Sequence, residues 1–109
     1  MNFDIKTEQL SDDSYVISLA GEVDLYTAPE FKQQLLEVIG QGGKEVVVDF
    51  SDTTFIDSTT LGVLVGGVKR LRSSDGQLAI RVERFFAACR TEIDRAGIAG
   101  AEQVGRHVA

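Results

Sequence analysis

Alternating hydrophobic and polar positions open the chain on either side of a short turn. Residues 3–10 alternate in this way, and Ser11-Asp12-Asp13 is a turn signal. Residues 14–20 then predict a second strand, which Gly21 closes. We expect these two strands to form a hairpin at the edge of a sheet.

The hydrophobic spacing becomes helical after Tyr26. Thr27 and Glu30 have the Thr-x-x-Glu spacing of a capping box. Tyr26 and Phe31 occupy the two positions of a hydrophobic staple, and Gly40 is the expected stop. The pattern therefore predicts a first helix from Thr27 to Gly40.

Strand and helix patterns alternate through the rest of the chain. The run Val46-Val47-Val48, within residues 45–50, is typical of a strand buried on both faces of a parallel sheet. The later expected elements are a helix over 59–73, a strand over 78–82, a helix over 83–96 and a weakly marked strand over 102–108. This order implies βαβ units with right-handed crossovers, and hence an α/β fold with parallel strands.

Helical periodicity predicts which side of the second helix packs on the sheet. That side carries Leu61, Leu64, Val65, Val68 and Leu71. Gly62 and Gly66 lie towards its flanks, where a missing side chain would let helix and sheet approach closely. Val63, Gly67 and Arg70 fall on the opposite side. An apolar Val63 facing water is a modest indication of a partner surface.

Size, charge and cysteine content limit the number of domains, the class of partner and the cellular compartment that we expect. The 109 residues, 43% of them hydrophobic, are enough for one domain with a single core. A net charge of −6 opposes binding to nucleic acid or an anionic membrane, and favours a soluble protein partner. The N-terminal segment lacks the regions of a signal peptide, and the single Cys89 excludes an internal disulfide. We expect a cytoplasmic protein.

Catalytic and phosphate-binding sites are poorly supported. The only histidine is His107, near the C-terminus, and the flanks of Ser58 do not form a G-x-S-x-G elbow, so a serine hydrolase is not expected. Residues 40–45 resemble a phosphate loop superficially, but no Ser or Thr follows Lys44. The basic cluster at residues 69–72 complements a helix C-terminus, which favours a solvated face over a phosphate site.

Ser58 stands where the N-cap of the second helix is expected, directly after Asp57. A serine at such a position is usually a cap, which contributes about 1 kcal/mol. The alternative is that the serine is displayed for another protein to modify. Spacing by itself does not choose between the two.

Three neighbouring motifs carry a resemblance to a known family. They are Gly21-Glu22-Val23-Asp24 followed by Thr27-Ala28, Val47-Val48-Asp49-Phe50-Ser51, and Phe55-Ile56-Asp57-Ser58-Thr59-Thr60-Leu61-Gly62. With these motifs the chain resembles the anti-sigma factor antagonists of the STAS domain family over residues 3–82. The resemblance implies a mixed, mostly parallel sheet flanked by helices. Residues 1–109 are then a single STAS domain, with an atypical C-terminal part from about residue 83.

The resemblance implies a phosphorylation switch at Ser58. Unmodified, the chain would bind an anti-sigma factor that is also a serine protein kinase, and would thereby release a sigma factor. ATP and Mg²⁺ would belong to that kinase and a separate phosphatase would reset the switch, so the chain needs no cofactor or metal and is not an enzyme. The residues expected to contact the partner are Asp24, Asp57, Ser58, Thr59, Thr60 and Val63.

Two alternatives stay open at this point. Asp24 and Asp57 either have a functional role, in which they orient the Ser58 hydroxyl or contact the kinase, or simply cap their own turns. Where family members often have glycine this chain has Thr60, which places a second hydroxyl near the first. The alternative function is that of a STAS domain serving as a structural or regulatory subunit of a transport or stress-signalling complex, in which Ser58 is never modified. The presence of Asp57-Ser58 favours the phosphorylation switch.

Overall fold

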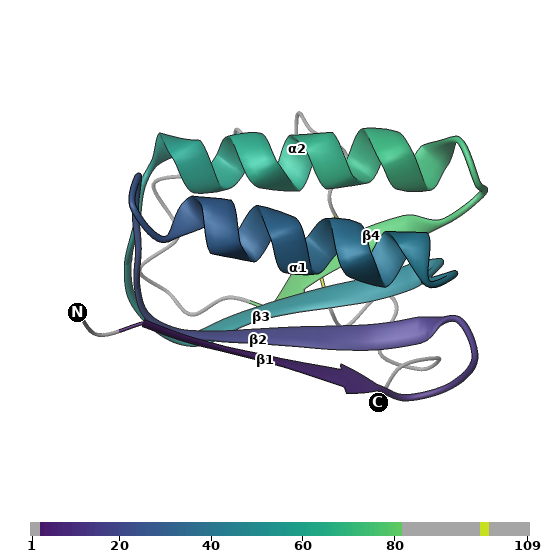
Figure 1. Ribbon diagram of the computed structural model, residues 1–109, viewed down its shortest axis with the longest axis horizontal. Coiled ribbons are helices and arrows are strands. Elements are labelled where there is room, and N and C mark those ends of the chain that lie inside the picture. Colours follow the sequence, from purple (N-terminus) through teal and green to yellow (C-terminus); the bar gives the residue numbers. More distant parts are fainter. Residues whose placement is uncertain (1–2, 82–98, 101–109) are drawn as a thin grey trace.

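A mixed sheet with two helices on one face makes up the computed structural model, which describes residues 3–81 and 99–100 (Figure 1). The elements are β1 (Phe3–Gln9), β2 (Ser14–Val23), α1 (Ala28–Gly40), β3 (Glu45–Ile56), α2 (Ser58–Arg72), β4 (Gln77–Arg81) and β5 (Ala99–Gly100). The strand order is β1-β2-β3-β4-β5. Only β1 and β2 pair antiparallel, and the other neighbours are parallel. The expected mostly parallel α/β sheet is confirmed.

The chain order explains why α1 and α2 cover the same face. Each helix connects two parallel strands that are neighbours in the sheet, β2 to β3 and then β3 to β4. Successive right-handed crossovers in one direction place their helices on one side. The carboxyl ends of β2 and β3 therefore meet at one edge of the sheet, where α2 also begins (Figure 1).

The hydrophobic core lies between these two helices and the sheet. Its most deeply buried large side chains include Ile17, Leu19, Phe31, Leu35, Val46, Val48, Phe50, Leu64 and Leu71. Phe31 of α1 and Phe50 of β3 meet edge to face, with ring centroids 6.2 Å apart and an interplanar angle of 82°. Such aromatic pairs contribute about 0.5–1.5 kcal/mol beyond the area they bury, so this contact helps to fix α1 on the sheet.

The start of α1 differs from the expected capping box and staple. The Thr27 side chain makes no capping hydrogen bond to the helix. Its hydroxyl instead donates to the carbonyl of Glu22 (3.0 Å) and accepts from the amide of Asp24 (2.8 Å). Tyr26 is exposed whereas Phe31 is fully buried, so the two do not form a staple. The capping box is wrong because the Thr27 hydroxyl serves the end of β2 rather than the first turn of α1, and the staple is wrong because Tyr26 remains exposed to solvent.

Both long parallel strands extend further than predicted. β2 reaches Val23 rather than residue 20, and β3 reaches Ile56 rather than residue 50. The register between them shifts at Ser18/Ala20 and again at Gly21/Glu22, where Gly21 adopts a φ of 88°. These irregularities let pairing continue through a residue that usually ends a strand. The helix predicted over 83–96 and the strand over 102–108 lie outside the described residues.

The buried side of α2 is broader than its hydrophobic pattern predicts. Leu64, Val68 and Leu71 are buried as expected. Gly67, expected on the opposite side, is also buried, and a Cβ there would lie 2.7 Å from Cδ2 of Leu35 and 3.2 Å from Cδ1 of Leu78. Because α2 packs against α1 as well as against the sheet, the flank of α2 that faces α1 is buried too.

Two other glycines of α2 contradict the predicted close approach. Gly62 and Gly66 are exposed, and a Cβ built at either would have nothing within 4 Å. They do not bring the helix closer to the sheet. Their missing side chains instead leave open space on the surface of α2.

Replacing the adjacent glycines 66 and 67 by alanine is expected to change stability in opposite directions. Gly66→Ala should stabilise the fold by up to about 1 kcal/mol, because alanine favours a helix and nothing obstructs its methyl group. Gly67→Ala should destabilise it by about 1–3 kcal/mol, because the methyl group would overlap the buried Leu35. Thermal melts followed by circular dichroism measure both. Melting shifts of the same sign would contradict this packing of α2.

Candidate functional site

Asp57 caps the N-terminus of α2. Its backbone is extended (φ −129°, ψ −174°), and its Oδ1 accepts a hydrogen bond from the amide of Thr59 at 3.0 Å. The amide of Thr60 donates to the Asp57 carbonyl at 3.1 Å. The prediction that Ser58 is the cap is therefore wrong, since β3 runs to Ile56 and leaves only Asp57 between strand and helix. Ser58 is the first residue of α2.

The three consecutive hydroxyls at this helix end differ in accessibility. Ser58 is exposed, and its hydroxyl has no hydrogen-bond partner in the part of the chain that the structure describes. The hydroxyl of Thr59 donates to Oδ1 of Asp57. The hydroxyl of Thr60 is fully buried and donates to the carbonyl of Val23 at 3.1 Å. Of the three, Ser58 is the one whose hydroxyl is both exposed and unengaged.

Thr60 was expected to contact a partner, and its burial contradicts this. Thr60 lies on the side of α2 that faces the sheet, where its hydroxyl satisfies the last carbonyl group of β2. A buried carbonyl without such a donor would cost about 1–3 kcal/mol. The Thr60 hydrogen bond thus links the first turn of α2 to the end of β2 in the interior of the protein. It does not place a second hydroxyl on the surface beside Ser58.

Asp24 organises the turn that follows β2. Its Oδ1 accepts hydrogen bonds from the amides of Tyr26 (2.9 Å) and Thr27 (3.1 Å). Val23 and Ile56, the last residues of β2 and β3, pair directly in the parallel register. Asp24 and Asp57 therefore follow neighbouring strand ends, and both are partly exposed. Each carboxylate has a local capping role, and each belongs to a residue at the edge of the sheet where α2 begins.

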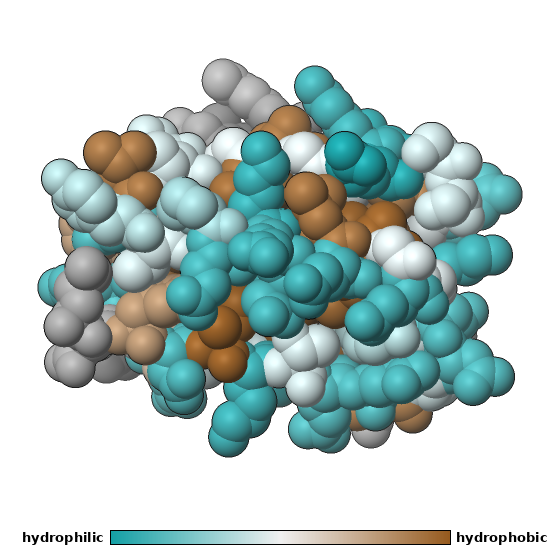
Figure 2. All heavy atoms as spheres, viewed as in Figure 1, coloured by the Kyte–Doolittle hydropathy of each residue, from teal (hydrophilic) through white to brown (hydrophobic). Residues whose placement is uncertain are grey.

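Val63 lies beside a groove rather than on an open surface. Its side chain is half-buried and packs against the margin of the core, so the expectation that it faces away into water is corrected. Val63 lines a hollow of about 460 Å³ between the two helices, which we call the α1–α2 groove. Residues lining it include Lys32 and Leu36 from α1, and Thr59, Val63, Gly66 and Arg70 from α2. Figure 2 shows hydrophobic residues exposed among hydrophilic ones on the side of the molecule where α1 and α2 are seen.

Sequence reasoning missed a set of large exposed side chains around the strand ends. Leu25, Tyr26 and Phe55 are 61%, 78% and 48% exposed. Leu25 and Tyr26 follow β2 directly, and Phe55 is the penultimate residue of β3, so all three belong to the same edge of the sheet as Ser58. The sequence did offer a signal for these residues. Leu25 and Tyr26 are two large hydrophobic residues in the short loop before α1, where polar residues are more common.

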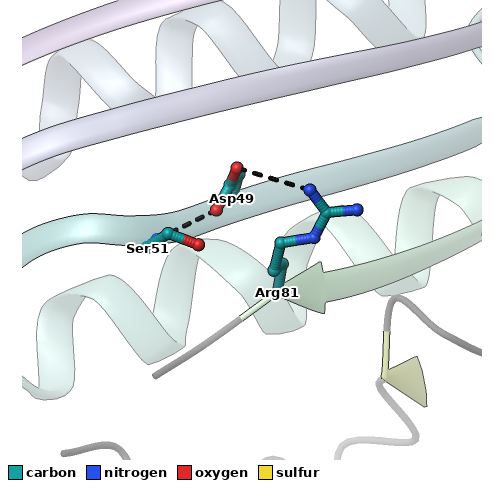
Figure 3. Close-up of polar contacts among 3 residues, drawn as sticks. All are labelled: Asp49, Ser51 and Arg81. Atoms are coloured by element: carbon teal, nitrogen blue, oxygen red, sulfur yellow. Dashed lines mark hydrogen bonds and ion pairs between the residues drawn. The ribbon is translucent and has the colours of Figure 1, made fainter. Parts of the chain in front are cut away.

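Asp49, Ser51 and Arg81 form a polar cluster that belongs to the sheet rather than to this edge (Figure 3). Oδ1 of Asp49 accepts a hydrogen bond from the amide of Ser51 at 2.9 Å, and its Oδ2 lies 3.9 Å from Nη1 of Arg81. Asp49 alternates with the core residues Val48 and Phe50, so it points to the face opposite α1 and α2. Because the Arg81 side chain is 55% exposed to solvent, the ion pair contributes no more than about 1 kcal/mol.

A family model now accounts for most of the chain. The model described as "Mlab, STAS domain" matches residues 7–104. The chain belongs to the STAS domain family. This STAS domain is also 36% identical over 91 residues to an anti-sigma-B factor antagonist of Staphylococcus epidermidis, a match that covers 79% of this chain and 83% of the relative.

Solved structures agree with the STAS fold. The anti-sigma factor antagonist SpoIIAA in its unphosphorylated form superposes with a TM-score of 0.78 at 20% identity, covering 94% of this chain and 96% of that one. An anti-sigma factor antagonist from Mycobacterium paratuberculosis superposes with a TM-score of 0.71 at 26% identity, covering 88% and 79%. The resemblance inferred from the three motifs is confirmed.

The described residues offer neither a membrane-crossing helix nor a metal-binding cluster. Neither helix there is both long and apolar enough to cross a bilayer. Residues 3–81 and 99–100 also contain no cluster of three or more His, Cys, Asp or Glu side chains placed to hold a metal ion.

Proposed function

We propose that this STAS domain is an anti-sigma factor antagonist that is switched off by phosphorylation of Ser58. In its unmodified form it binds an anti-sigma factor that is also a serine kinase, and a sigma factor is released. The chain acts as ligand and substrate rather than as an enzyme, and the kinase supplies ATP and Mg²⁺. A separate phosphatase restores the binding form. The setting is the cytoplasm, and the S. epidermidis relative, an anti-sigma-B factor antagonist, supports the role.

The accessibility of the Ser58 hydroxyl is the observation that carries this proposal. A kinase needs a hydroxyl that it can enclose, and Ser58 is exposed in the first turn of α2. The neighbouring hydroxyls are held by Asp57 and by the carbonyl of Val23. Modifying Thr60 would require the start of α2 to leave the sheet, and modifying Thr59 would break its hydrogen bond to Asp57, so both features favour Ser58 as the substrate.

The surroundings of Ser58 have the character of a protein interface. Apolar Leu25, Tyr26 and Phe55 are exposed at the same edge of the sheet as the partly exposed carboxylates of Asp24 and Asp57. Interfaces combine exposed aromatic and apolar residues with a polar rim. A partner that contacts this edge would cover Ser58, so the same residue can serve as contact and as switch.

Mapping the phosphate tests the proposal. The chain, Ser58→Ala and Thr59→Ala are each incubated with purified anti-sigma factor kinases of the source organism and ATP, and modified sites are located by mass spectrometry. We expect one phosphate on Ser58 in the native chain and in Thr59→Ala, and none in Ser58→Ala. Thr59→Ala is the matched control because it removes the adjacent hydroxyl and leaves Ser58 in place.

Two outcomes would contradict the assignment. A phosphate on Thr59 or Thr60 in place of Ser58 would mean that Ser58 is not the switch, and a phosphate on the buried Thr60 would also mean that the start of α2 opens. A native chain that accepts no phosphate from any such kinase would favour the alternative, an unmodified STAS subunit of a larger complex.

A further inference from the structure

We propose that the α1–α2 groove is a second docking surface, and that it takes an acidic segment bearing apolar side chains from the same anti-sigma factor that contacts Ser58. This inference rests on the proposed function and extends it, since it assigns a separate surface on α2 and the chemistry of the segment that fills it. Shape, charge and position each support it.

The groove owes its depth to glycines that the helix does not need for packing. Gly62 and Gly66 both line it, and a Cβ at either would meet nothing within 4 Å. Glycine disfavours a helix interior, so two exposed glycines four residues apart weaken α2 without improving its contacts. The half-buried Val63 and Leu36 give the hollow apolar walls. Its volume of about 460 Å³ is sufficient for several side chains of a partner.

The charge of the groove is opposite to that of the whole chain. The protein carries a net charge of −6, yet the two charged residues that line the groove are the exposed cations Lys32, from α1, and Arg70, from α2. Within residues 3–81, neither takes part in an ion pair. Carboxylates on a bound segment would supply the missing counter-charges, whereas a basic segment would be repelled.

The groove continues directly from the candidate phosphorylation site. Thr59 lines one end, next to Ser58, and Arg70 lines the other. The axial distance between these two residues is about 16 Å at the rise of an α-helix. About five residues of an extended segment, or about eleven of a helical one, would span it. One partner can therefore cover Ser58 and fill the groove at the same time.

Charge reversal at two neighbouring residues tests the electrostatic part. Arg70→Glu and Lys69→Glu change the net charge equally, and both positions are exposed in the last turn of α2, but only Arg70 lines the groove. Binding of purified anti-sigma factor kinases of the source organism is measured by calorimetry. We expect Arg70→Glu to weaken binding at least tenfold, and Lys69→Glu to weaken it less than threefold.

Filling the groove tests the shape. Gly66→Leu should weaken binding at least tenfold while the melting temperature stays equal to or above that of the native chain, because the added side chain occupies open space. Gly66→Ala, whose methyl group is small, is the matched control and should retain most of the affinity. Native-like melting of both variants excludes unfolding as the cause.

Each other result would overturn the docking surface. Equal weakening by Arg70→Glu and Lys69→Glu would indicate a long-range field rather than a groove contact. Native affinity of both Arg70→Glu and Gly66→Leu, with Ser58 still phosphorylated, would reject the groove and leave the proposed function intact. Sedimentation that reveals a dimer abolished by Gly66→Leu, with unchanged kinase binding, would assign the groove to a second copy of the chain. A native chain that binds no anti-sigma factor would reject both proposals.

Discussion

Phosphorylation of Ser58 is expected to weaken binding of this chain to its anti-sigma factor by a few hundredfold. A phosphoserine adds about 1.5–2 negative charges. The N-terminus of α2 offers it limited stabilisation, because the Asp57 carboxylate already accepts the amide of Thr59 and a helix dipole contributes only about 0.3–1 kcal/mol. Burying the added charge in an interface without a cationic partner would cost about 3–4 kcal/mol. Because about 1.4 kcal/mol corresponds to a tenfold change in affinity, this cost weakens binding by roughly a few hundredfold.

The effect should fall on the complex and not on the fold. Ser58 is exposed and its hydroxyl makes no hydrogen bond within the described chain, so the phosphate breaks none and the far-UV spectrum should stay unchanged. Ser58→Ala should bind the anti-sigma factor constitutively, and Ser58→Asp should reproduce the phosphate only in part, having a smaller charge and a shorter reach. Calorimetric titration of the phosphorylated and native forms gives the ratio directly. Equal affinities would rule out this switch.

Leu64→Asp is expected to unfold the domain at 25 °C. Leu64 is 1% exposed and belongs to the hydrophobic core between the helices and the sheet. Truncating such a leucine costs about 2–5 kcal/mol, and an unpaired buried carboxylate adds several more. The sum is comparable to the whole stability of a domain, about 5–15 kcal/mol. Loss of the far-UV helical signal and of a cooperative melt is the measurement.

Val63→Asp is the matched comparison at the adjacent position. Val63 is half-buried at the margin of the core and lines the α1–α2 groove. The variant should stay folded, at a cost of about 1–2 kcal/mol, rather than melt like the native chain as its place in the hydrophobic pattern suggests. Binding to the anti-sigma factor should fall in this variant. Unfolding as complete as that of Leu64→Asp would mean that the groove is closed in solution.

Local chemistry along the chain was enough to predict most elements and the serine. The bounds predicted for α1 and α2 hold to within one residue, because the spacing of apolar side chains and the glycine break after α1 act within a few residues. The order of strands and helices required parallel pairing and right-handed crossovers. The motif around Asp57 and Ser58 indicates the family without the tertiary structure.

The identity of the helix cap depended on how far β3 continues. Whether Asp57 or Ser58 caps α2 is set by the pairing of β3 with β2, which runs to Ile56 and cannot be judged from residues 57–60 alone. Thr60 turns inward because the last carbonyl of β2, 37 residues away in sequence, needs a donor. Both are long-range hydrogen bonds or pairings, which no local pattern contains.

The roles of the glycines in α2 likewise depended on the neighbour of the helix. A helical wheel shows which residues share a side, but it does not say that α1 lies against one flank. Contact with Leu35 of α1 makes Gly67 a packing residue, whereas Gly62 and Gly66 face the groove. Periodicity along one helix therefore identified the side that meets the sheet, and the packing of two helices on the same face created both the buried glycine and the groove.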